Sequence, residues 1–168
     1  MNPLLGLGKF CAKPPSPAGA FGLRYAPIEW VDAESYERLV TGVNNWQQNI
    51  LFAEGGWLTA PLVPQTAAAT PRTAMTAQAA TTEASIRAEL HHPTPEIVGE
   101  LFRTVRHRHV VAFTDAQGTP WLAGTRDYPL EFTFDHSEPR GTARRGFTIQ
   151  FTGSLPFALA GFTPIFDV

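Results

Sequence analysis

The stretch LEFTFDH at residues 130–136 alternates apolar and polar side chains, and FTIQFT at residues 147–152 repeats the pattern. Because successive side chains of a β-strand point to opposite faces, each stretch has one apolar and one polar face. Two such strands predict an antiparallel sheet that covers a core on one side.

The same alternation occurs earlier in the chain, at residues 84–90. Its apolar positions share one face of the predicted strand: Ala84, Ile86, Ala88 and Leu90. Two shorter apolar runs, at residues 109–114 and 120–124, flank a turn sequence at 115–118 and predict two more strands. Most of the chain between residues 84 and 152 is therefore predicted to be β-structure.

One helix, at about residues 94–108, interrupts the predicted strands. Thr94 is a suitable N-cap, Pro95 suits the first helical position, and Glu96 faces the positive end of the helix. One apolar stripe at helical spacing predicts the face that packs on the sheet: Ile97, Val98, Leu101, Phe102 and Val105. Four other residues are predicted to point outward: Glu100, Arg103, Thr104 and Arg106.

The two ends and one internal tract have unusual compositions. Residues 1–27 are rich in Gly, Pro and Ala and predict an extended N-terminal arm. Residues 28–168 are predicted to form a single β-rich domain, in which residues 155–168 are an apolar tail. Within it, residues 65–84 are almost entirely Ala and Thr, so they are interpreted either as a flexible linker or as a strand with small side chains. The fold class is α+β, dominated by β-structure.

The composition limits the classes of function. The chain has 168 residues, of which 43% are apolar and only 17% are charged, and its formal net charge is −2. This is enough apolar material for a core, and a surface with few charges suits a protein that associates with copies of itself. A dedicated nucleic-acid binder would need a surplus of Lys and Arg.

The sequence also indicates the cellular compartment in which the chain is made. Cys11 is the only cysteine, so an intrachain disulfide is excluded. Neither a signal peptide nor an apolar stretch of about 20 residues is recognisable, which predicts synthesis in the cytoplasm without insertion into a membrane.

The search for catalytic or metal-binding residues finds only weak patterns. His91 and His92 precede the helix and His107 and His109 follow it, but about 14 helical residues would separate the two pairs by roughly 20 Å. The residues 6–9, GLGK, lack the spacing of a phosphate-binding loop. Four carboxylates are candidates from which an acid–base pair could form: Asp115, Asp127, Glu131 and Asp135. The sequence therefore predicts no catalytic residue, no cofactor and no metal, and a protein that is not an enzyme.

Two other classes of function stay open. One is a monomeric β-sandwich that binds a ligand on Trp57 or Trp121, and the other is a small metal-dependent hydrolase that uses His and Asp. The best candidate for contacting a polyanion is a cluster of three arginines: Arg140, Arg144 and Arg145. An ordinary solvated loop is the alternative interpretation of this cluster.

Three stretches resemble small virion structural proteins of Bacteroidetes phages and prophages: QGTPWLAG at 117–124, YPLEF at 128–132 and RGFTIQFTG at 145–153. In those proteins, a strand with the pattern G-x-x-W/L-L-G is followed by P-L-x-F and by a strand ending in F-x-G. The resemblance covers the C-terminal third of the chain and extends to residues 30–58.

The resemblance implies a fold and a role. Phage tail-tube proteins are β-sandwiches with one helix at the sheet margin, and copies join their sheets into a ring. The expected fold is then an antiparallel β-sandwich or barrel with one packed helix and extended arms. The expected function is a self-assembling subunit of a phage tail, a tail-like tube or a tail junction, without catalysis.

The expected partners are further copies in a ring or tube, neighbouring virion proteins, and DNA in passive contact inside a lumen. The expected interface consists of the arm at Pro14 to Pro17, the strand at 73–90, the arginine loop and the apolar tail. Its residues are Pro14, Pro17, Ile86, Arg87, Arg140, Arg144, Arg145, Phe157, Phe162 and Phe166.

Overall fold

The computed structural model describes residues 22–32, 52–63, 66–75, 80–90, 94–114, 120–137, 146–155 and 160–161. In these residues, one antiparallel sheet of nine strands and one α-helix dominate, so the prediction of a β-dominated α+β fold is confirmed. The strands are β1 (Leu23–Pro27), β2 (Leu58–Thr59), β3 (Ala68–Met75), β4 (Ala80–Leu90), β5 (Arg108–Thr114), β6 (Pro120–Ala123), β7 (Leu130–Ser137), β8 (Gly146–Leu155) and β9 (Ala160–Gly161). The helices are the 3-10 helix η2 (Ile28–Trp30) and the α-helix α2 (Pro95–Thr104).

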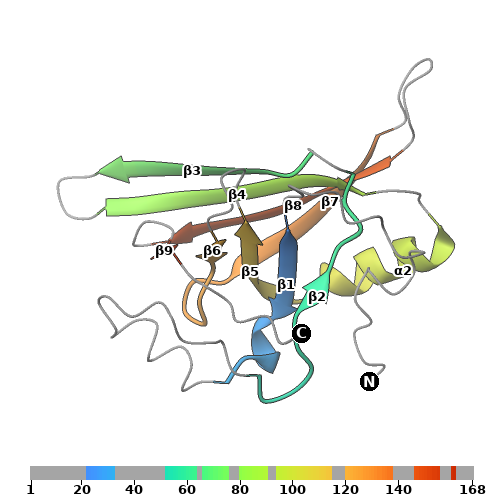
Figure 1. Ribbon diagram of the computed structural model, residues 1–168, viewed down its shortest axis with the longest axis horizontal. Coiled ribbons are helices and arrows are strands. Elements are labelled where there is room, and N and C mark those ends of the chain that lie inside the picture. Colours follow the sequence, from blue (N-terminus) through green and yellow to red (C-terminus); the bar gives the residue numbers. More distant parts are fainter. Residues whose placement is uncertain are drawn as a thin grey trace.

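The sheet branches at β5. Its main path is β2-β1-β5-β7-β8-β4-β3, while β6 pairs with β5 and with β9. One side of β5 pairs with β1, and its other side pairs with β7 at Arg108 and His109 and with β6 from Val111 onward. The branch divides the sheet into a long half (β7, β8, β4 and β3) and a short half (β9, β6, β5, β1 and β2). The long half lies across the short half (Figure 1).

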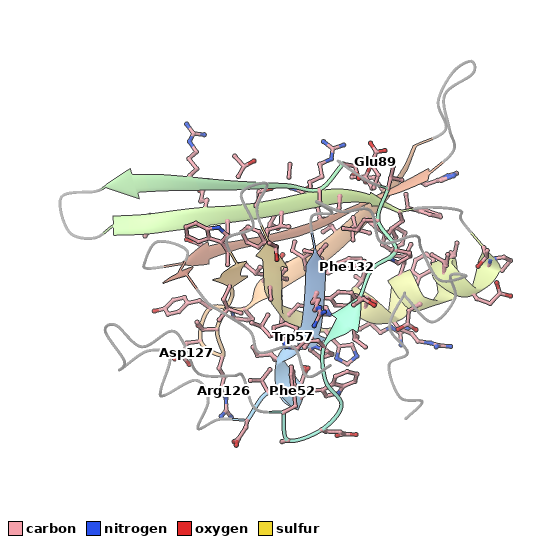
Figure 2. The ribbon with its side chains drawn as sticks, viewed as in Figure 1. Phe52, Trp57, Glu89, Arg126, Asp127 and Phe132 are labelled. Atoms are coloured by element: carbon pink, nitrogen blue, oxygen red, sulfur yellow. The ribbon has the colours of Figure 1, made fainter. Side chains whose placement is uncertain are left out.

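The main core lies between the two halves and receives side chains from both. In the long half, the predicted alternation is confirmed for nine residues, which are buried, whereas Phe134 is half-buried and His136 is exposed at the end of β7. The nine are Ala84, Ile86, Ala88, Leu90, Leu130, Phe132, Phe147, Ile149 and Phe151. The short half contributes Leu23, Tyr25, Val111, Phe113 and Ala123. Figure 2 shows Phe132 in this region. Burial of these side chains between the halves is the main force that holds the halves together.

The other face of the short half is covered as well. A second cluster consists of Ala26, Val31, Val110, Ala112 and Leu122. Phe52 and Trp57 pack against it, with their ring centroids 5.4 Å apart (Figure 2). Gly55 allows this segment to approach Trp30, because a Cβ at Gly55 would lie 2.5 Å from the indole ring. The short half is therefore buried on both faces.

The helix begins where the sequence predicts and ends earlier. The Thr94 hydroxyl accepts a hydrogen bond from the backbone N–H of Ile97 at 3.3 Å, which confirms the N-cap. The helix ends at Thr104 because the chain turns at residues 105–107 and enters β5 at Arg108. The buried face contains Ile97, Glu100, Leu101 and Thr104, whereas Phe102 and Val105 are exposed. The prediction that places Phe102 and Val105 in the buried stripe and turns Glu100 and Thr104 outward is therefore wrong.

The structure corrects the prediction for residues 23–27 and decides between the two interpretations of the Ala/Thr tract. Residues 23–27 were assigned to the extended arm, but they form β1, because Leu23 and Tyr25 bury their side chains in the core. In the Ala/Thr tract, the strand interpretation holds for the residues of β3 and β4, which pair along their length from Ala68 opposite Arg87 to Met75 opposite Ala80. The described strands follow an open path from β2 to β3 and do not close into a barrel.

Candidate functional site

Two of the predicted interface residues lie in the described part of the chain. Ile86 and Arg87 are neighbours on β4 and point to opposite faces. The Ile86 side chain is 1% exposed and packs in the core of its own chain, so it is not available at the surface, whereas Arg87 is exposed. The other eight fall outside the described residues: Pro14, Pro17, Arg140, Arg144, Arg145, Phe157, Phe162 and Phe166.

The outer face of the long half is polar and carries charges of both signs. The strand register places Arg87, Gln150 and Thr133 side by side across β4, β8 and β7. Gln150 donates a hydrogen bond from Nε2 to the Ser85 hydroxyl oxygen at 3.0 Å. Glu89 is exposed near the end of β4 (Figure 2). A surface of this kind offers a neighbour both hydrogen-bonding groups and charges that a complementary surface can pair.

The outer edge of β3 pairs with no other described strand. Pro71 lies in the middle of this strand, opposite Ala84 of β4. Because proline has no backbone N–H, it fits the ladder where its nitrogen points away from β4, toward the open edge. Residues two positions apart share this direction, so Thr73 directs its N–H outward too. Pro71 thus protects one end of the edge from pairing, and the region from Thr73 to Met75 can accept a strand.

The start of β3 is anchored by one hydroxyl. Leu62 bridges to Leu90, and Ala68 pairs with Arg87. More residues separate Leu62 from Ala68 than separate Arg87 from Leu90, so the chain that leads into β3 bulges relative to β4. In this bulge the Thr66 hydroxyl donates to the carbonyl oxygen of Val63 at 2.7 Å and accepts from the backbone N–H of Glu89 at 3.1 Å. Thr66 therefore supplies the hydrogen bond that the interrupted ladder lacks.

The outward face of α2 is apolar with a basic flank. Phe102 is 60% exposed and Val105 is 44% exposed. The Phe102 ring makes a T-shaped contact with the half-buried Phe134 of β7, with ring centroids 5.3 Å apart. Arg103 and Arg106 are exposed next to them. Sequence reasoning missed this surface, although Val98, Phe102 and Val105 recur at positions i, i+4 and i+7, a spacing that defines a second helix face.

The histidines in the described residues have separate environments. His107 Nδ1 lies 3.6 Å from Glu29 Oε2, and His136 is exposed with its ring against Phe147. His109 is buried in the core. His91 and His92 fall outside the described residues. No three His, Cys, Asp or Glu side chains converge as metal ligands in the part of the chain that the structure describes.

Among the described residues, His109 has the pKa that lies furthest from its ordinary value. Its removal from water, with a smaller contribution from the charge of His107, lowers the pKa of His109 from 6.5 to about 3. The ring packs against Tyr25, Phe132 and Phe151. Among the described residues, neither ring nitrogen has a hydrogen-bond partner. The alternation from His109 through Val111 to Phe113 could have indicated that this side chain faces the core.

The remaining candidates from the sequence occupy ordinary positions. Glu131 forms an ion pair with Arg108 across β7 and β5, and Asp135 is exposed on the outer face of the long half. Asp127 is exposed in the turn at residues 125–128 (Figure 2). Asp115 lies outside the described residues. Trp57 packs on the second cluster, and the half-buried Trp121 packs on the main core.

Comparison with protein families, with characterised proteins and with solved structures finds no match to the chain. No helix in the described residues is long and apolar enough to cross a membrane. The candidate site therefore rests on the geometry of the chain itself: the β3 edge, the polar outer face of the long half, and the exposed face of α2.

Proposed function

We propose that the protein is a structural subunit that assembles with copies of itself into a ring or tube of a phage tail or a tail-like particle, and that it performs no catalysis. The observation that carries the proposal is the outer edge of β3, which is unpaired among the described strands and is next to a polar face with charges of both signs. An open edge of this kind forms backbone hydrogen bonds with an added strand.

Two further observations support assembly. The exposed face of α2 offers Phe102 and Val105 to a neighbour, and the adjacent Arg106 favours a partner surface with acidic residues, whereas Arg103 already pairs with Glu100. The chain as a whole has only 17% charged residues and a net charge of −2, so copies repel one another weakly. The resemblance to Bacteroidetes phage virion proteins points in the same direction.

In this proposal, the two halves of the sheet form an antiparallel β-sandwich, and α2 packs at its margin. The β3 edge of one copy adds to the sheet of the next copy, and Arg87 lies on the outer face beside that contact. The arginines at 140, 144 and 145 face a partner or DNA in the lumen, and the apolar tail at 155–168 contacts a neighbouring copy or another virion protein.

Light scattering across a range of concentrations, with negative-stain images of the same sample, tests the proposal. The expected result is a particle of defined diameter whose mass is a multiple of 18.4 kDa. A monomer at every concentration refutes self-assembly and favours the monomeric binding module.

A matched pair of variants tests the β3 edge. Thr73→Pro removes an N–H from the open side of β3 and leaves the ladder to β4 intact, so it is expected to prevent assembly without unfolding the chain. Thr73→Val keeps the N–H and serves as the control. If Thr73→Pro assembles as the wild type does, the edge of β3 is not the interface.

A further inference from the structure

His109 is an ionisable side chain inside an apolar core. It is 0% exposed, and aromatic rings from three strands surround it: Tyr25 from β1, Phe132 from β7 and Phe151 from β8, with ring centroids 5.6, 6.0 and 5.6 Å away. Neither of its ring nitrogens has a hydrogen-bond partner among the described residues. A neutral imidazole leaves a donor and an acceptor unsatisfied here, and an imidazolium would leave a buried charge without water.

His109 also lies at the branch of the sheet. It pairs with Pro27 of β1 on one side of β5 and with Leu130 of β7 on the other side. The backbone is tightly packed at this point, because a Cβ at Gly124 would lie 2.9 Å from the His109 carbonyl oxygen. A displacement of the His109 ring is therefore transmitted to the joint between the long and short halves.

The charged groups near His109 offer it no compensation. Arg24 of β1 and Glu131 of β7 are each next to a core residue in sequence, so they lie on the faces of their strands that point away from the core. On that face, Glu131 pairs with Arg108. The neighbouring His107 contacts Glu29. A positive charge on His107 disfavours protonation of His109. On α2, the carboxylate of the buried Glu100 lies 3.3 Å from Arg103.

We propose that His109 is an acid-operated switch: when its imidazole takes up a proton, water enters the core at the branch, and β5 separates from β1 and β7. The core lowers the pKa of His109 from 6.5 to about 3, whereas an opened chain binds the proton at the ordinary value. Because the opened state binds more protons, the folded state loses stability as the pH falls below about 6.5, and the loss is complete near pH 3. The switch acts within one chain and does not depend on the proposed assembly.

Urea unfolding, followed by tryptophan fluorescence at pH 7.5 and pH 5, tests the switch. Between these pH values, the unfolding equilibrium constant of the wild type is expected to rise roughly 30-fold more than that of His109→Leu. His136→Gln is the matched control, because His136 is exposed on β7, and this variant is expected to keep the full acid response. Equal pH dependence of the wild type and His109→Leu overturns the proposal.

Hydrogen exchange and NMR locate the opening. Amides of β5 and β7 near His109 are expected to lose protection at pH 5 before those of β3 and β4, after correction for the intrinsic exchange rate. If His109→Leu fails to fold, titration of the wild-type imidazole decides the question. Proton uptake that coincides with loss of the native signals of β5 supports the switch, and uptake near pH 6.5 in the folded chain refutes it.

Discussion

Separate replacement of Leu101 and Phe102 by alanine tests which face of α2 carries the fold. The two residues are adjacent, and helical spacing in the sequence assigns both to one apolar stripe. In the structure, the Leu101 side chain is 0% exposed within the main core, whereas that of Phe102 is 60% exposed. The structure therefore predicts unequal losses of stability for the two substitutions.

The magnitudes follow from burial. Leu101→Ala removes a fully buried side chain and leaves a cavity, which costs about 3 kcal/mol of unfolding free energy. A fully buried Phe contributes about 3 kcal/mol, so two fifths of that burial gives Phe102 about 1 kcal/mol. Its T-shaped contact with Phe134 adds about 0.5 kcal/mol. Leu101→Ala is thus expected to cost about twice as much as Phe102→Ala.

Thermal unfolding at a concentration where the chain is monomeric measures the difference. In a domain of this size, 1 kcal/mol shifts Tm by roughly 2–4 °C. Leu101→Ala is expected to lower Tm by roughly 6–12 °C and Phe102→Ala by roughly 3–6 °C. Equal losses, or a larger loss for Phe102→Ala, would refute the assignment of the helix faces. A loss for Phe102→Ala that grows with protein concentration would show that a neighbouring copy covers this ring.

Gly153→Ala is expected to cost about 1–3 kcal/mol of unfolding free energy in urea titration, because the new Cβ would lie 2.6 Å from Leu130 Cδ2. Gly99→Ala is its control on α2: nothing lies within 4 Å of the new Cβ, and the substitution is expected to stabilise by about 1 kcal/mol. Thr66→Val removes the acceptor of the Glu89 N–H, whereas the Val63 carbonyl oxygen keeps its bond from the Thr66 N–H, so the change is expected to cost about 1 kcal/mol. The same change at the exposed Thr70 on β3 is expected to alter stability by less than about 0.5 kcal/mol, and equal losses at the two threonines would contradict the role of the bulge.

The helix shows how far local pattern extends. Thr94 and Pro95 determine where α2 begins, because capping involves only residues within one turn. The rotation of the helix about its axis is not a local property. Two apolar faces occur side by side on it, and contact with the sheet selects the one that contains Ile97 and Leu101. The sequence could not rank them without knowledge of the partner surface.

The Ala/Thr tract and the end of the predicted arm show a related limit. Small side chains in β3 provide little hydrophobic drive, so composition alone could not decide between linker and strand. The backbone ladder to β4 decides it. At residues 23–27 the Pro-rich and Gly-rich context dominates the prediction, whereas Leu23 and Tyr25 are buried only because β5 lies alongside them.

The candidate site was partly predictable. The strand that contains Arg87 was identified as an interface element, but the same alternation that exposes Arg87 sends Ile86 into the core. The exposed face of α2 was missed because all its apolar residues were assigned to one stripe. The burial of His109 was missed because the histidines were considered as metal ligands and not as members of an alternating strand.

By itself, the sequence determined which side chains share a face in β4, β7 and β8, where the helix begins, and that β-structure dominates. These features depend on residues a few positions apart, through the two-residue period of a strand and the hydrogen bonds of one helical turn. Only the tertiary structure decided the strand order, the branch at β5, the rotation of α2 and the isolation of His109. These depend on contacts between residues far apart in the chain, and burial between the two halves selects them from patterns that are locally equivalent.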